Sequence, residues 1–316
     1  MTTQLERLSS IVHHNFMLLG FPPVPPLNAS VIIPARNSVS TIGEQLEALA
    51  AQEYLLDFEV MVCDNGSTDG LRDFVDAYPK HARMSVTWLD ASEEPGAAFA
   101  RNVGIKASKG DFLAFCDADD RVHPGWLQQL ILAADTADLV SGAMETESIN
   151  DPLIHSWRPL EPTAEPLEYS TFLPRMMSCN FGAWKHACEA VGGFDEIMSG
   201  AGEDVDFSWR IQLAGMTFTH EPKAVVAYRL RSTLRDTWRQ SKAYGESDVD
   251  LYVAYREYGF KRSSANEVAT QVIGVVLLNP LVPRRLAKIP RGRWVIAAGA
   301  LAGKLHGSWK RRVWYI

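Results

Sequence analysis

The amino-acid sequence predicts an α/β protein with a mostly parallel central sheet and a helical extension at its C-terminus. From residue 28 onward, strand-like runs rich in β-branched residues alternate with runs of helical period, which is the pattern of βαβ units. Hydrophobic residues make up 47% of the 316 residues and charged residues 22%, a balance typical of globular proteins. A chain of this length forms one large domain or two of ordinary size.

The predicted elements follow one another in a regular order. The first strand is 31–33, and the helix after it begins near Ser40 and carries apolar residues along one face. Further strands are predicted at 58–63, 85–89, 112–116 and from 139, and further helices at 71–78 and after Pro124. Five prolines within 151–174 argue against a sheet element there, so this stretch is expected to be an irregular excursion that covers a site.

Composition divides the chain into three parts. Residues 1–27 form an N-terminal lead-in, because the proline-rich segment 21–26 is a stiff connector before the first strand. Residues 28–235 carry the α/β pattern. Residues 236–316 are expected to form a helical, basic extension, since aromatic and apolar residues recur there at helical spacing.

Charge is distributed unevenly between the body and the end of the chain. Residues 1–267 hold 22 basic and 38 acidic residues, a net charge of −16, whereas 268–316 hold nine basic residues and no acidic ones. An acidic body is a poor partner for nucleic acid, because phosphate binding needs a basic face. The class of nucleic-acid-binding proteins is therefore excluded for the body.

The compartment is predicted from cysteines and apolar segments. The four cysteines are too few for a disulfide scaffold and lack metal-site spacing, which favours a reducing compartment. The N-terminus lacks the pattern of a secretory signal, and the longest apolar stretches fall short of the ~20 residues of a spanning helix. A cytoplasmic protein without a transmembrane helix is expected.

The final segment combines cations with aromatic residues that favour membrane interfaces. This mixture is typical of a peripheral helix on an anionic membrane, here the inner face of the cell membrane. A solvated helical face or a contact between two copies of the chain is the alternative. The residues concerned are Arg284, Arg285, Lys288, Arg291, Arg293, Trp294, Trp309, Lys310, Arg311, Arg312, Trp314 and Tyr315.

Three polar clusters follow predicted strands, at 34–37, 64–70 and 117–120. Because ligands of open α/β sheets bind outside the carboxyl ends of the strands, the clusters are expected to converge on one crevice. Each cluster alone also has the ordinary composition of a turn. In the third, closely spaced carboxylates suit Mg²⁺ or Mn²⁺ bound together with a diphosphate. Capping of the next helix is the alternative role for Asp120.

Four segments in this order resemble family 2 glycosyltransferases of the GT-A (nucleotide-diphospho-sugar transferase) fold. They are VIIPARN, CDNGSTDG, PGAAFARNVGIKASKGDFLAFCDADD and GGFDEIMSGAGEDVDFSWR. The resemblance covers about 28–235, which it marks as a GT-A catalytic domain. It implies a nucleoside-diphosphate sugar as donor and a divalent metal, Mg²⁺ or Mn²⁺, as cofactor.

The resemblance also implies roles for residues that bind the donor. Pro34, Ala35 and Arg36 would line the nucleotide pocket, and Asp64 would contact the base. Asp117 would contact the ribose or the metal, and Asp119 would be the principal metal ligand. Arg101 would lie beside the nucleotide, although a position on the helix surface or a salt bridge explains it equally well.

A second set of residues is expected around the acceptor. Glu203 and Asp204 fall at a predicted helix start, where the helix dipole favours an ionised carboxylate. By the resemblance Asp204 would be the general base, and Glu203 would hold the acceptor or support the geometry of the site. Helix capping is the alternative. The segment 179–182 resembles the acceptor loop of the family, so Asn180 and Trp184 would contact sugar, unless Trp184 belongs to the core.

One departure from the family pattern concerns the third metal ligand. The family often supplies a histidine near a strand after the acidic pair, but this chain has Tyr228 and Arg229 there. Arg229 and Arg231 are therefore hypothesised to pair with diphosphate oxygens.

The sequence thus predicts an inverting glycosyltransferase that moves a sugar to a hydroxyl of a saccharide acceptor. The basic tail suggests that this acceptor is lipid-linked and belongs to cell-envelope polysaccharide synthesis. Transfer to a polyprenyl phosphate and a non-catalytic sugar-nucleotide-binding subunit are the alternatives. The nucleotide, the sugar and the linkage depend on loops that the sequence does not place.

Overall fold

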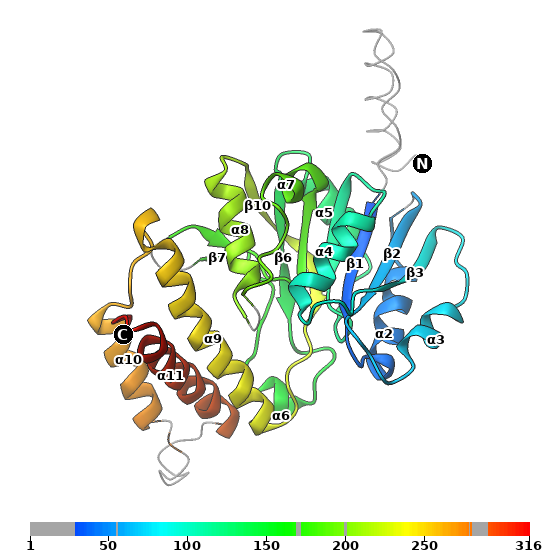
Figure 1. The fold of residues 1–316 in the computed structure, drawn as a ribbon. Helices are drawn as coiled ribbons and strands as arrows, with labels where there is room; N and C mark the ends of the chain where they lie inside the picture. The colour runs from blue at the N-terminus through cyan, green and yellow to red at the C-terminus, as the bar shows by residue number, and fades with distance from the viewer. Residues whose placement is uncertain (1–28, 55, 169–171, 199–200, 278, 280–289) are drawn as a thin grey trace.

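The computed structural model describes residues 29–316 apart from 55, 169–171, 199–200, 278 and 280–289 (Figure 1). The predicted lead-in 1–27 lies outside the described residues, and so do Arg284, Arg285 and Lys288 of the basic tail.

Eight strands form the central sheet, in the order β3-β2-β1-β4-β9-β6-β10-β5. Two of them, β9 and β5, run antiparallel to their neighbours, and the other pairings are parallel. The prediction of a mostly parallel sheet is therefore confirmed. The strands are β1 (Ala29–Ala35), β2 (Phe58–Asp64), β3 (Met84–Asp90), β4 (Phe112–Cys116), β5 (Arg121–Val122), β6 (Leu139–Glu145), β9 (Asn180–Trp184) and β10 (Phe218–Ala227).

Helices cover both faces of the sheet because successive strand residues point to opposite sides. Val31 and Ile33 pack under one set of helices, and Ile32 packs under the other. The first set is α2 (Val39–Ala50), α3 (Leu71–Asp76) and α5 (Trp126–Ala133). The second set is α4 (Ala97–Ala107), α7 (Lys185–Ala190) and α8 (Glu203–Leu213).

The proline-rich stretch after β6 stays outside the main sheet, but the prediction that it is irregular and holds no sheet element is wrong in part, since it contains a short helix and a two-stranded ribbon. Asp151 caps the short helix α6 (Pro152–His155) by accepting a hydrogen bond from the Leu153 amide. A separate two-stranded ribbon pairs β7 (Leu167–Glu168) with β8 (Pro174–Arg175). The excursion therefore lies beside the sheet, where it is available to cover a site.

The C-terminal extension is helical, in agreement with the sequence. It contains α9 (Leu234–Tyr255), the 3₁₀ turn η1 (Arg256–Tyr258), α10 (Ala265–Leu277) and α11 (Arg291–Arg311). Helix α9 begins just before the predicted domain boundary at 235/236 and is anchored to α8 by aromatic packing, in which Tyr255 meets Trp209 edge to face. Within the described part of the chain, every helix is too short or too polar to cross a bilayer.

Helices α9 and α11 lie side by side with their backbones in close contact (Figure 1). Glycines make this approach feasible, because a Cβ at Gly245 would overlap the carbonyl oxygen of Ala300. On α11, a Cβ at Gly303 would in turn overlap the carbonyl oxygen of Lys242. The extension is therefore a packed helical pair and not a set of independent helices.

Gly245→Ala is expected to lower the free energy of unfolding by about 1–3 kcal/mol, because the added methyl group must push two helix backbones apart. Gly274→Ala in α10 is the matched control. Nothing lies within 4 Å of a Cβ at that position, so it should raise stability by about 0.5–1 kcal/mol. Urea unfolding measures both, and equal effects would contradict the close packing.

Candidate active site

A cleft of about 1580 Å³ opens where the carboxyl ends of the parallel strands meet. Its lining comes from the turn after β1, the turn after β4, the residues before β9, the start of α8, the segment after β10 and one face of α9. The three polar clusters predicted from the sequence lie at this edge. The second is fastened to the first, since the Asn37 amide donates to Ser67 Oγ at 2.8 Å and the Val39 amide donates to Asp69 Oδ2 at 2.9 Å.

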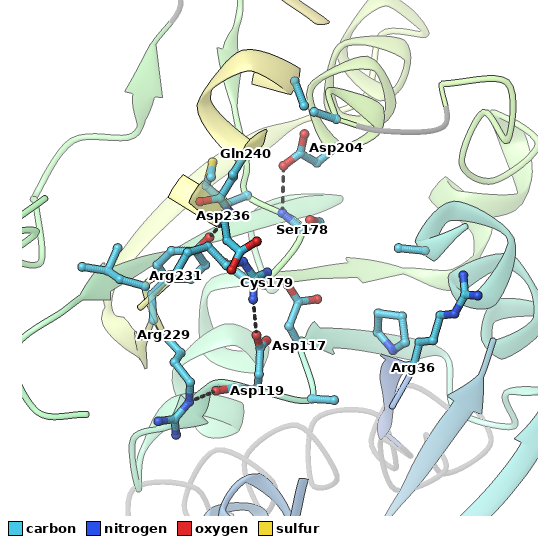
Figure 2. Close-up of a pocket in the computed structure, with 18 of the residues that line it drawn as sticks. Arg36, Asp117, Asp119, Ser178, Cys179, Asp204, Arg229, Arg231, Asp236 and Gln240 are labelled. Carbon is cyan, nitrogen blue, oxygen red and sulfur yellow. Dashed lines mark hydrogen bonds and ion pairs between the residues drawn. The ribbon is translucent and has the colours of Figure 1, made fainter. Parts of the chain in front are cut away.

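Pro34, Ala35 and Arg36 of the first cluster line the cleft, as expected for a nucleotide pocket. Figure 2 shows Arg36 on the opposite side of Asp117 from Arg229 and Arg231. Cationic side chains therefore flank the acidic turn from both sides.

Asp64 is buried, and its carboxylate is bonded within the protein. Its Oδ1 accepts a hydrogen bond from the Ser67 amide at 2.8 Å, and its Oδ2 accepts one from Trp88 Nε1 at 3.0 Å. The neighbouring Asn65, and not Asp64, lines the cleft. The structure thus assigns Asp64 to holding this turn, and its contact with a nucleotide base stays a prediction.

Arg101 of α4 joins the two acidic regions of the cleft. Its side chain is only 2% exposed, with Nη2 3.0 Å from Asp117 Oδ1 and Nη1 3.1 Å from Glu203 Oε1. Burial opposes the charged form, but the surrounding carboxylates raise the pKa of the guanidinium above its ordinary value. Of the alternatives considered from the sequence, the structure shows the salt bridge, in a buried position and not on the helix surface.

The turn 117–120 concentrates three carboxylates, of which Asp120 is fully buried and Asp117 and Asp119 are half-buried at the edge of the cleft. Burial raises the pKa of Asp117, which Arg101 partly offsets. Burial and the charges of Asp117 and Asp119 raise the pKa of Asp120 well above its ordinary value. The alternative that Asp120 caps the next helix is wrong, because α5 begins at Trp126 with Gly125 as its N-cap.

These acids form a donor set that fits a divalent cation. Asp120 Oδ1 accepts the Arg229 amide at 2.7 Å, while Oδ2 is buried and finds no hydrogen-bond partner among the described residues. Ligand atoms of Asp117, Asp120 and Cys179 all lie within 4.8 Å of one another. Because Mg²⁺ and Mn²⁺ prefer oxygen ligands, the carboxylates and not the thiol are the expected ligands.

Arg229 and Arg231 lie beside the same turn, and their hypothesised pairing with diphosphate oxygens stays a prediction. Arg229 Nε donates to the Asp119 carbonyl oxygen at 2.6 Å, and Arg231 Nη1 is 3.0 Å from Asp119 Oδ2 (Figure 2). Arg229 Nη2 forms an ion pair with Glu44 Oε2. Positive charge is therefore held where an anionic leaving group would meet the acids.

Glu203 and Asp204 occupy the first turn of α8, as predicted. The N-cap is Gly202 at φ 90°, a left-handed conformation that suits glycine, so neither acid is the N-cap. Asp204 Oδ2 accepts a hydrogen bond from the Ser178 amide at 3.1 Å, and its side chain lines the cleft (Figure 2). Burial and the Asp204 charge raise the pKa of Glu203, against the opposing effect of Arg101.

The placement of Asn180 and Trp184 corrects the expectation that they contact an acceptor. Asn180 is fully buried, where its Oδ1 accepts from Trp126 Nε1 at 2.7 Å and its Nδ2 donates to two backbone carbonyls. Trp184 lies at the other end of β9, donates to the Ala134 carbonyl and packs against Phe112. Both are structural, because 180–184 is a buried strand and not a loop.

The sequence missed the wall that α9 contributes to the cleft. Asp236, Gln240 and Ser247 of α9 line it, together with Arg158 and Arg175 of the proline-rich excursion. The spacing of the three α9 residues, i, i+4 and i+11, places them on one helical face. That polar face was the available signal, but the sequence does not show which face of the helix meets the catalytic domain.

The raised pKa values of Asp117, Asp120 and Glu203 predict how stability depends on pH. Above the ordinary carboxyl pKa of about 4, the unfolded chain loses these protons before the folded protein does. The free energy of unfolding of the metal-free protein therefore falls as pH rises through the raised pKa values.

Mg²⁺ should counteract this loss, since it neutralises the ionised acids. We expect Mg²⁺ to raise the melting temperature more at about pH 7.5 than at about pH 5, with the difference reduced in Asp120→Asn. Differential scanning fluorimetry measures the shifts. An equal Mg²⁺ effect at both pH values would contradict the prediction.

Comparisons with known proteins agree with this architecture. Residues 30–189 match the family model described as Glycosyl transferase family 2. The pre-mycofactocin glycosyltransferase of Mycobacterium tuberculosis (strain ATCC 25618 / H37Rv) is 32% identical over 248 residues, which cover 74% of this chain and 50% of that protein. The chain thus spans about half the length of this relative. The poly(ribitol-phosphate) beta-N-acetylglucosaminyltransferase TarS of Staphylococcus aureus (strain Mu50 / ATCC 700699) is 37% identical over 95 residues, 30% of this chain and 16% of that protein.

Solved structures show the same fold. The mannosyltransferase PcManGT from Pyrobaculum calidifontis, in complex with GDP-Man and Mn²⁺, aligns with a TM-score of 0.59 over 96% of both chains at 16% identity. S. aureus TarS 1–349 aligns with a TM-score of 0.52 over 92% of this chain and 93% of that chain at 20% identity. The predicted GT-A fold is confirmed.

Proposed function

Because this chain belongs to glycosyl transferase family 2, we propose that it is an inverting glycosyltransferase. It moves a sugar from a nucleoside-diphosphate sugar to a hydroxyl of a saccharide acceptor. The observation that carries the proposal is the convergence of Arg36, Asp119 and Asp204 on one cleft from three distant segments (Figure 2). These residues supply a nucleotide side, a leaving-group side and a base within one enclosed space.

At the donor end, the nucleotide lies along the turn 34–36 and the diphosphate lies toward Asp117 and Asp119. By the resemblance Asp117 and Asp119 would hold Mg²⁺ or Mn²⁺, and Asp120 is the further carboxylate whose oxygen lies close to that of Asp117. The cation would offset the negative charge of the leaving diphosphate. Arg229 and Arg231 support the same charge from the other side, since both already contact Asp119.

At the acceptor end, Asp204 accepts the proton of the attacking hydroxyl. The hydroxyl oxygen bonds to the anomeric carbon while the bond from that carbon to the diphosphate oxygen breaks, so the configuration inverts. The Ser178 amide holds one oxygen of the Asp204 carboxylate in place. The Arg101 bridge fixes the start of α8, and therefore Asp204, relative to the donor acids.

Binding and turnover of a panel of nucleotide sugars test this function. Thermal shift with UDP- and GDP-sugars in the presence of Mg²⁺ or Mn²⁺ should identify a donor that raises the melting temperature. Donor consumption with release of the nucleoside diphosphate should then follow. A donor that binds without being transferred or hydrolysed would instead support a non-catalytic sugar-nucleotide-binding subunit.

We further propose that the acceptor is a lipid-linked saccharide of a cell-envelope polymer, used at the cytoplasmic face of the membrane. The relative TarS, a poly(ribitol-phosphate) beta-N-acetylglucosaminyltransferase, supports a polymer substrate. At the end of α11, Trp309 and Trp314 are 78% and 72% exposed, next to the cations of 310–312. Such a surface suits an anionic bilayer.

Trp309→Ser combined with Trp314→Ser is expected to weaken binding to anionic vesicles by about tenfold, because two interfacial rings are lost. Flotation with phosphatidylglycerol vesicles measures this, and phosphatidylcholine vesicles show how much depends on charge. Leu153→Ser, at a 63% exposed position in α6, is the control. Unchanged flotation of the double variant would argue against the anchoring role.

A further inference from the structure

A second, smaller cavity of about 180 Å³ lies between α9, α11 and the residues that follow α6. One part of its wall is apolar and consists of Trp157, Leu230, Ile296 and Ala300. Its volume is close to the ~150 Å³ of an apolar cavity that binds one benzene ring. It therefore has room for about one five-carbon isoprene unit.

The other part of the wall is polar, and most of it is shared with the active-site cleft. Arg158, Arg231, Gln240 and Tyr244 line both cavities, whereas Thr237 and Ser241 line the smaller one alone. The two spaces therefore adjoin at the shared side chains. Gln240 Nε2 donates to Tyr228 Oη at 3.2 Å, which holds the amide in this wall. The junction thus offers two guanidinium groups, an amide and a phenol.

Of the two cations at this junction, Arg158 is the one that can bind an anionic ligand. Arg231 is occupied by Asp119, but among the described side chains no carboxylate lies within 4.0 Å of the Arg158 guanidinium. Burial raises the pKa of both Tyr228 and Tyr244, and the Arg158 charge opposes that rise in each. Its positive charge therefore acts on the interior of the junction, where an anion would complement it.

We propose that the smaller cavity binds the proximal apolar chain of a lipid phosphate whose phosphate group lies at Arg158. A free sugar needs no apolar cavity, and a free phosphate needs none either. In an apolar chain joined to a phosphate, the chain packs against the apolar part of the wall and the phosphate pairs with Arg158 in the polar part. The inference rests on the proposed function and deepens it, because it specifies that the lipid of the acceptor is joined to the rest of the molecule through a phosphate group.

Calorimetric titration with geranyl phosphate tests the proposal, with inorganic phosphate and geraniol as its two halves. Geranyl phosphate should bind about tenfold or more tightly than either half. Arg158→Met removes the cation, and Ala300→Leu fills the cavity. Each should weaken geranyl phosphate binding by about tenfold. Ala297→Leu, at a half-buried position of α11 outside both cavities, is the matched control and should change nothing.

Titration of the same variants with UDP and GDP separates this inference from the proposed function. Ala300→Leu, at a position outside the active-site cleft, should retain the nucleotide affinity of the unchanged protein. Nucleotide binding without geranyl phosphate binding would overturn the lipid phosphate site and leave the glycosyltransferase intact. Equal weakening by Ala297→Leu, or inorganic phosphate binding as tightly as geranyl phosphate, would also overturn it.

Discussion

Replacing Asp204 by asparagine is expected to lower the turnover number of sugar transfer by about 10²–10⁴-fold, the range typical for loss of a general base. Asparagine keeps the size of the side chain and can still accept the Ser178 amide hydrogen bond through its oxygen. It cannot accept the proton of an attacking hydroxyl. The affinity for UDP or GDP should stay unchanged, because Asp204 lies at the acceptor end of the cleft.

Asp135→Asn, an exposed position after α5, is the control for the loss of one negative charge. Turnover close to that of the unchanged protein in Asp204→Asn would contradict base catalysis. It would favour a polyprenyl phosphate acceptor, which is already ionised and needs no base. A parallel loss of nucleotide affinity would instead assign Asp204 a role in the shape of the cleft.

Arg101→Met should lower the free energy of unfolding by about 3–5 kcal/mol, the range for removing one partner of a buried ion pair. The guanidinium is 2% exposed, and its partners Asp117 and Glu203 are 28% and 14% exposed. Without it, two poorly solvated carboxylates face each other and the other acids of the cleft. Urea unfolding of the metal-free protein at neutral pH measures the loss.

A double-mutant cycle separates this ion pair from the packing of the arginine stem. Glu203→Gln in the Arg101→Met background should cost less than in the unchanged protein, because the uncompensated charge is already present. Arg239→Met is the comparison, since its pair with Asp236 is largely exposed and should contribute no more than about 0.5 kcal/mol. Similar losses for Arg101→Met and Arg239→Met would contradict the bridging role.

The parallel part of the sheet was predictable because its strands are local features of the sequence. Runs such as 58–63 are short, apolar and rich in β-branched residues, and the polar clusters begin where these runs end. Since parallel strands place their carboxyl ends at one edge, the meeting of Asp119 with the turn 34–36 followed from position alone.

The features that the sequence did not predict depend on packing between segments that are distant in the chain. Strand β9 contains a polar residue and a glycine, so its residues resemble a loop, yet Asn180 is satisfied by bonds to Trp126 and to the backbone of β6 and β10. The wall formed by α9 required knowledge of where Gly202 and α11 hold that helix. Similarly, the sequence around Arg101 is compatible with a residue on the helix surface, and only the folded structure shows that Asp117 and Glu203 enclose it.

The position of β9 also constrains the order in which the chain acquires its shape. This strand joins β4 to β6, although it follows both of them in sequence. While the chain is being synthesised, β4 lacks its second neighbour until β9 has emerged from the ribosome, and β6 lacks both of its neighbours until β9 and then β10 have emerged. Exposed strand edges during translation invite pairing with other nascent chains. The delay between residues 145 and 180 is therefore the interval in which this protein would most need a chaperone.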